Sequence, residues 1–157
     1  MGEPPTSEGE ARSPDAFEGR ALIAAEALCA ARGERLNDPG RRVLKALLAS
    51  GAPLKAYDLM HALASGGRAA APPTVYRALK FLIAMDLAHR IESLNAFVAC
   101  RFPGEPHLPG FRVCEGCGAA EEFILNKASP EIAGYEKGRL IFEVVAPCSS
   151  CAEDDTD

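Results

Sequence analysis

The chain has 157 residues, of which 48% are hydrophobic and 25% are charged, and its formal net charge is −5. This length suits one medium domain or two small ones, with the composition of a soluble globular protein. No apolar run approaches the roughly 20 residues that span a bilayer. Residues 1–20 lack the apolar and basic regions of a secretory signal. We therefore expect a cytoplasmic protein without a membrane partner, in which six cysteines are thiols or metal ligands rather than disulfides.

Positive charge is concentrated between Glu34 and Arg90, where nine Lys or Arg residues stand against four acids, and the rest of the chain carries −10. Contact with phosphate needs a local positive face rather than a positive whole. This asymmetry is compatible with a nucleic-acid partner. Solvated helix faces in a protein that binds no DNA explain it equally well.

The N-terminal half is expected to be helical. Residues 1–15 are rich in Pro, Gly, Ser and Glu, which predicts a disordered segment. After it, apolar residues recur at helical spacing, and Asp38 followed by Pro39 can cap and begin a helix. The expected helices cover 17–32, 38–50, a segment that opens at 55, and 72–87.

The pattern then changes to short runs of β-formers. The runs 88–93 and 96–101 are separated only by Leu94 and Asn95, which predicts a hairpin. Helices followed by a two-stranded hairpin are the outline of a winged helix-turn-helix, which we place at 16–101. Three prolines and a glycine make 102–109 a predicted hinge.

Residues 110–152 are expected to form a small α/β unit, so the predicted fold class is α+β. Below about 60 residues, a metal or a partner subunit usually supplies stability that a small core lacks. The expected strands of this unit are 111–113, 120–125 and 139–145.

Two CxxC pairs stand out in this C-terminal unit. They comprise Cys114 with Cys117 and Cys148 with Cys151, separated by 30 residues. A CxxC turn can place two sulfurs on one ion, and four thiolates give the closed tetrahedral coordination of structural zinc. Two unrelated redox or incidental pairs are the alternative. Neither pair follows a strand in a βαβ unit, which disfavours a thioredoxin-like role.

A second possible metal site is less obvious from spacing. His89, Cys100, His107 and Glu122 are all of residue types that bind zinc. Each also has an ordinary structural interpretation, such as a surface histidine or a small buried cysteine. The residues alone leave both interpretations open.

The sequence does not resemble an enzyme. Pro147 and the last CxxC match half of the zinc deaminase signature, but the required HxE motif is missing. Catalytic zinc also keeps one position open for water, whereas each candidate cluster offers four protein ligands. Phosphate-binding glycine motifs, GxSxG and HExxH are absent from the sequence. We expect no enzymatic activity and no small-molecule substrate.

Five motifs in order resemble the ferric uptake regulator family, and most of all its zinc-sensing members. The resemblance covers about residues 20–151. The motifs are PLKAYDL at 53–59, PPTVYRAL at 72–79, HRIES at 89–93, FVAC at 97–100 and CEGCG at 114–118.

The resemblance implies a homodimeric, metal-dependent repressor of zinc-uptake genes. It implies a winged-helix domain that binds operator DNA and a dimerisation domain at 110–152. The four CxxC cysteines match the family's structural zinc, so two Zn²⁺ per subunit are expected. The matching set for the sensing zinc is His89, Cys100, His107 and Glu122.

The predicted DNA contacts lie in and around the third and fourth helices. By resemblance, a DNA-contacting tyrosine and arginine fall on Tyr57 and Arg77. An arginine early in the fourth helix can pair with guanine or with phosphate. The remaining candidates are Lys55, Thr74, Tyr76, Lys80 and Arg90, with Arg41 and Arg42 as further possible phosphate contacts.

The donor set favours zinc over iron, because Cys100 is a soft thiolate beside two imidazoles. The histidine-rich stretch typical of the family's iron sensors does not precede the first CxxC. An iron or manganese sensor of the same family remains an alternative. So does a winged-helix module in which zinc is purely structural.

Overall fold

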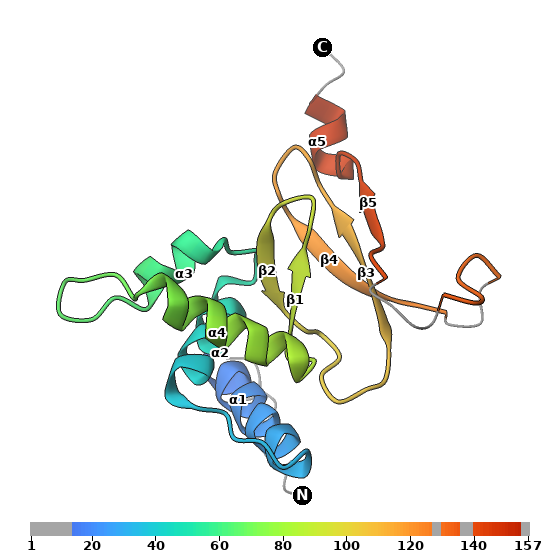
Figure 1. The fold of residues 1–157 in the computed structure, drawn as a ribbon. Helices are drawn as coiled ribbons and strands as arrows, with labels where there is room; N and C mark the ends of the chain where they lie inside the picture. The colour runs from blue at the N-terminus through green and yellow to red at the C-terminus, as the bar shows by residue number, and fades with distance from the viewer. Residues whose placement is uncertain (1–13, 127–129, 136–139, 155–157) are drawn as a thin grey trace, which may run out of the picture.

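The fold was obtained as a computed structural model, which describes residues 14–126, 130–135 and 140–154. Four helices come first, followed by a two-stranded hairpin, a three-stranded sheet and a short C-terminal helix (Figure 1). Within the described part, no helix is both long and apolar enough to cross a membrane. The helices are α1 (Pro14–Ala31), α2 (Asp38–Ser50), α3 (Ala56–Ala62), α4 (Pro72–Ala84) and α5 (Ser149–Asp154).

The ends of α2 follow local chemistry, with one difference from the sequence prediction. Asn37, not Asp38, is the N-cap: its side chain accepts a hydrogen bond from the backbone N–H of Gly40 at 2.9 Å. Asp38 is the first helical residue, where its negative charge favours the helix dipole. The helix ends at Gly51, whose φ of 61° is in the left-handed region that glycine adopts without strain.

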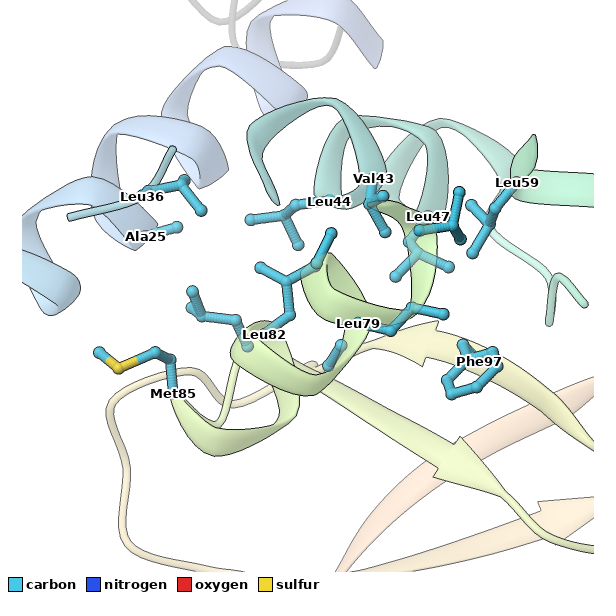
Figure 2. Close-up of a cluster of buried hydrophobic side chains, with 14 of the residues drawn as sticks. Ala25, Leu36, Val43, Leu44, Leu47, Leu59, Leu79, Leu82, Met85 and Phe97 are labelled. Atoms are coloured by element: carbon cyan, nitrogen blue, oxygen red, sulfur yellow. The ribbon is translucent and has the colours of Figure 1, made fainter. Parts of the chain in front are cut away.

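The main hydrophobic core lies among the helices and the start of the hairpin (Figure 2). Leucines of α2, α3 and α4 point inward, and Leu59 and Leu82 are fully buried. Burying each such side chain contributes about 1.5–3 kcal/mol before entropy is counted. The core therefore holds α4 at a fixed angle to α2 and α3, and the opposite face of α4 stays exposed.

The hairpin, called the wing below, is formed by β1 (Ala88–Ile91) and β2 (Ala96–Ala99), as predicted. Asn95 in its turn has a φ of 48°, which asparagine tolerates better than most residues. Leu54 pairs with Phe97 through two backbone hydrogen bonds of 2.8 and 2.9 Å. The wing is thereby fixed to the segment between α2 and α3.

The second sheet has the strand order β4-β3-β5, with β3 (Leu108–Val113), β4 (Ala120–Leu125) and β5 (Glu143–Val145). β3 pairs antiparallel with β4 and parallel with β5. β3 begins inside the predicted hinge, and includes Pro109. This proline is tolerated because β5 pairs only with Phe111 to Val113, so β4 is the one neighbour of β3 at Pro109 among the strands of the described residues.

Candidate metal centres and nucleic-acid interface

The two CxxC pairs come together at one end of the second sheet. The sulfurs of Cys114, Cys117, Cys148 and Cys151, called the four-cysteine cluster, all lie within 4.8 Å of one another. The first pair follows β3 and the second begins α5. Parallel pairing of β3 with β5 carries Ala146 to the carbonyl of Val113, at 3.1 Å, and so brings the two pairs to the same place.

Local hydrogen bonds favour the thiolate form of Cys114 in this cluster. Backbone N–H groups of Cys117 and Cys148 approach the sulfur of Cys114 at 3.5 and 3.1 Å. They lower the pKa of Cys114 to about 6. Hydrogen bonds that the Cys151 thiol donates to Cys148 and Cys114 raise its pKa to about 12, because they hold its proton, and the negative sulfur of Cys114 adds a smaller repulsion. A divalent cation would remove that conflict by attracting all four thiolates.

A second group of ligand types lies where the wing meets the second sheet. His89 is on β1, Cys100 directly follows β2, His107 directly precedes β3, and Glu122 is on β4. One ligand atom of each lies within 4.8 Å of the others, so the structure brings together all four residues singled out in the sequence. We call them the bridging cluster, because two belong to the wing side and two to the sheet side.

The distances in the bridging cluster suit a tetrahedral ion. Cys100 Sγ lies 3.6 Å from His107 Nε2 and 3.7 Å from Glu122 Oε1. Glu122 Oε1 lies 2.8 Å from His107 Nε2 and 3.1 Å from His89 Nε2. Ordinary zinc bond lengths imply edges of about 3.5 Å between sulfur and nitrogen and about 3.3 Å between oxygen and nitrogen. Only small side-chain movements would therefore be needed.

Backbone groups orient these ligands. His107 Nδ1 lies 2.6 Å from the carbonyl oxygen of Glu105. Since that oxygen can only accept, Nδ1 carries a proton, so Nε2 is the nitrogen whose lone pair would bind an ion in the cluster. The backbone N–H of Arg101 donates to Glu122 Oε2 at 2.7 Å, which leaves Oε1 facing the other ligands. Sequence patterns give no signal for these backbone partners.

One buried atom of the cluster is unsatisfied. Among the described residues, His89 Nε2 has no hydrogen-bond partner of acceptable geometry, although Glu122 Oε1 is 3.1 Å away. Buried polar atoms without partners are uncommon, and an ion is one way to satisfy them. The side chains of His107 and Glu122 are only 3% and 2% exposed. The donor set and its burial fit a zinc ion.

Electrostatics set the protonation of this cluster before any metal enters. Burial raises the pKa of Cys100 to about 12, and the negative charge of Glu122 adds to the effect. Burial also acts to raise the pKa of Glu122. Close contact with His89 and the hydrogen bond from Arg101 outweigh it and lower that pKa. The cluster therefore holds a carboxylate and a neutral thiol that a metal must deprotonate.

Neither cluster has the features of a catalytic metal site. Each offers four protein donors, which complete tetrahedral zinc coordination without leaving a position for water. The arrangement can hold parts of the chain together and make their relative position depend on the ion.

Most predicted DNA contacts are exposed on α3 and α4, which pack against each other. Tyr57 is 68% exposed and Tyr76 54% exposed, and large exposed side chains gathered on one face are typical of an interaction surface. The ring of Tyr57 stacks edge-on against His61, with centroids 4.5 Å apart. Further side chains open to solvent are those of Lys55, Arg77 and Lys80, with Thr74 half-buried.

Three of the basic candidates already have intramolecular partners. Arg90 donates to Asn95 within the wing at 2.9 Å. Arg42 donates to the carbonyl of Leu63 at 3.0 Å, beyond the C-terminus of α3, and Arg41 pairs with Glu26. The role of Arg42 in closing α3 follows from tertiary contact and had no counterpart in the sequence pattern.

The structure combines a winged helix, a small sheet and two closed clusters of zinc-type ligands. Together these features define a DNA-binding regulator that binds metal, rather than an enzyme.

No family model matches the chain. The zinc uptake regulation protein of Escherichia coli (strain K12) is 32% identical over 140 residues, which cover 84% of this chain and 81% of that protein. The chain belongs to the ferric uptake regulator family and is similar to its zinc uptake regulators.

Solved structures agree with this assignment. A zinc uptake regulator complexed with zinc and DNA matches with a TM-score of 0.77 and 30% identity, over 89% of this chain and 98% of that one. Holo XcZur matches with a TM-score of 0.72 and 35% identity, over 84% and 96%. The relative complexed with zinc and the four-cysteine cluster support zinc binding by this chain.

The apo form of the same relative is less similar. Apo XcZur has a TM-score of 0.50 at the same 35% identity, over 86% of this chain and 97% of that one. Since the sequence is shared, the lower score reflects a different arrangement of the folded chain. The arrangement described here is nearer to the holo form.

Proposed function

We propose that this chain is a zinc-responsive repressor of zinc-uptake genes, active in the cytoplasm as a zinc-loaded homodimer on operator DNA. The observation that carries the proposal is the bridging cluster. Its ligands come from both sides of the junction between wing and second sheet. An ion bound there would join the DNA-binding half to the other half.

The proposed mechanism follows from this position. In a dimer, the two recognition helices must match half-sites about one helical turn apart. Zinc in the bridging cluster holds each wing against its sheet and so restricts the separation of the helices. Without zinc the junction is looser, and DNA binding carries an added ordering cost. The greater similarity to holo than to apo XcZur supports a metal-linked arrangement.

We assign two zinc ions to each subunit. The four-cysteine cluster holds a structural ion, because its ligands follow β3 and lie at the start of α5 and so tie a small unit together. The bridging cluster holds the sensing ion. One thiolate with two imidazoles and one carboxylate favours zinc over iron or manganese.

The dimer contact is proposed for the second sheet. β5 is an edge strand in the described sheet, and its Val144 and Val145 are 57% and 47% exposed. Exposed apolar edge strands pair readily with another chain. A second copy of this chain would cover these side chains and extend the sheet.

For DNA recognition, we assign α4 to the major groove. Its buried face packs on the core, so Tyr76, Arg77 and Lys80 face outward. Arg77 in the first turns of α4 is suited to reading a guanine edge. Tyr57, Lys55 and Thr74 then lie near the backbone or bases, and Arg90 reaches phosphate from the wing by leaving its bond to Asn95.

A zinc titration of DNA binding tests the proposal. Duplexes selected from a random library by the zinc-loaded protein would be used, with binding followed by fluorescence anisotropy at fixed salt. Affinity should rise by about 5- to 150-fold as the weaker zinc site fills, as expected for a coupling of about 1–3 kcal/mol. If DNA affinity proves independent of zinc, the protein is instead a winged-helix module in which zinc is only structural. A steeper response to iron(II) or manganese(II) would support the other sensors of the family.

A further inference from the structure

A second contact between wing and sheet uses no metal ligand. Glu143 is the first residue of β5, opposite Phe111 in the register with β3. Its Oε1 accepts the backbone N–H of Glu92 at 2.6 Å, and its Oε2 accepts that of Ser93 at 3.0 Å. One carboxylate therefore holds two successive amides of the wing turn.

An apolar contact connects this carboxylate with the bridging cluster. Ile91 of β1 is fully buried against Phe111 and Val113 of β3, which are 5% and 2% exposed. The ring of Phe111 also meets that of His89, with centroids 5.7 Å apart. The wing thus contacts the sheet at three successive places along β1: His89, Ile91, and the turn at Glu92.

The two polar contacts lie at opposite ends of this interface. The extended strand from His89 to Ile91 spans about 7 Å, and the amides of Glu92 and Ser93 lie beyond its end, in the turn. A single attachment at the bridging cluster would leave the wing free to pivot about it. A second attachment at the turn removes that freedom.

We propose that Glu143 is a positioning residue for metal-dependent DNA binding, which locks the wing turn to the sheet when zinc holds the other end. The inference rests on the proposed function of the bridging cluster. Both contacts require the same docked position of the wing, so each favours the other. By thermodynamic linkage, loss of the Glu143 contact weakens zinc in the bridging cluster as well as DNA binding.

The substitution Glu143→Gln tests this with little change in shape. The amide of Gln can accept one backbone N–H through its oxygen, but its NH₂ group faces the other N–H, donor against donor. The change also removes a negative charge, which by itself would strengthen DNA binding. Weaker binding would therefore run against the general charge effect. Glu34→Gln, in an exposed loop, removes the same charge and is the matched control.

Zinc affinities of both clusters would be measured by competition with chelators, and DNA affinity by anisotropy. For Glu143→Gln we expect about tenfold weaker zinc binding in the bridging cluster and about tenfold weaker DNA binding at limiting zinc. Zinc affinity at the four-cysteine cluster should not change. Glu34→Gln should match the wild type or bind DNA slightly more tightly. Equal weakening at both clusters, or no change at either, overturns the proposal.

Amide hydrogen exchange provides a direct second measurement. In the zinc-loaded wild type, the amides of Glu92 and Ser93 should both be protected, and Glu143→Gln should leave at least one of them unprotected, because the Gln oxygen can accept only one of the two. Unchanged protection overturns the contact itself, even if DNA binding proves independent of zinc. If the wild type responds to zinc but the variant behaves identically, only the role of Glu143 is wrong, and the proposed function stands.

Discussion

His89 Nε2 and Glu122 Oε1 lie 3.1 Å apart, although one belongs to the wing and the other to the second sheet. β1 and β4 are not neighbours in either of the described sheets. Their contact therefore depends on how the two halves dock, and not on strand pairing. An ion bound by both residues would bind more tightly when the two halves are docked than when they are apart. Such a difference in affinity is what a metal-dependent switch requires.

Cys100→Ser should separate sensing from folding. A hydroxyl is a poor substitute for a thiolate on zinc, so affinity in the bridging cluster should fall by at least about tenfold. The zinc of the four-cysteine cluster should stay bound, and the variant should stay folded. Zinc-dependent anisotropy with selected DNA checks this. Wild-type zinc dependence in the variant would show that the bridging cluster is not the sensor.

Cys114→Ser should impair folding, whereas Cys100→Ser should impair sensing. It removes the sulfur that two backbone amides favour as a thiolate, and with it the closed coordination of the four-cysteine cluster. Since structural zinc binding is also folding energy, the C-terminal unit should unfold or the dimer dissociate. Circular dichroism and sedimentation measure these outcomes. A stable dimer that retains both zinc ions in each subunit would contradict the assignment.

Arg77→Ala distinguishes base reading from phosphate contact. If Arg77 pairs with guanine, affinity should fall by about 1–3 kcal/mol, with selectivity lost at one base-pair position. If it contacts phosphate, affinity should fall uniformly over sequences, and the salt slope should decrease by about one. Binding to a set of single-position variants of the selected duplex separates the two. Lys80→Ala, one helical turn away, serves as a comparison.

Cys29 should be the one unreactive thiol outside the metal clusters. Its side chain is fully buried on α1, and burial raises its pKa. In the zinc-loaded protein the other five cysteines would be ligands, so alkylation at neutral pH should be slow throughout. Removing zinc should make Cys117 react first, because it is the exposed member of the four-cysteine cluster. Rapid labelling of Cys29 in the loaded protein would contradict its burial.

The raised pKa of Cys29 also makes the stability of the protein depend on pH. The folded-state pKa of Cys29 lies above its unfolded value, so its contribution to the free energy of unfolding is complete below about pH 9. It is lost as the pH rises through the folded value. Cys29→Ala should reduce this alkaline loss, as measured by urea unfolding of the zinc-loaded protein at about pH 8 and above. An unchanged pH profile would mean that the shift is small.

Local sequence was sufficient for most of the elements. Helical spacing of apolar residues predicted α1 to α4, and two β-rich runs around Asn95 predicted the wing, because these signals need no distant partner. The short α5 was not predicted. The cap of α2 was assigned one residue late, since Asn37 and Asp38 are both good caps. The strand expected over 139–145 is confined to Glu143–Val145 among its described residues, and Arg139 lies outside them.

The sequence by itself determined which ligand types are present, because two CxxC pairs and a small number of histidines restrict the chemistry to soft and borderline metals. The residue types and spacings left open which of them meet, although the family resemblance indicated the set, and the tertiary structure decided it. His89, Cys100, His107 and Glu122 are separated by unrelated spacings, and the docking of wing on sheet places their ligand atoms within 4.8 Å of one another. The contact of Glu143 with the wing turn has the same origin. Backbone amides carry no sequence identity, so no pattern of residues could indicate them.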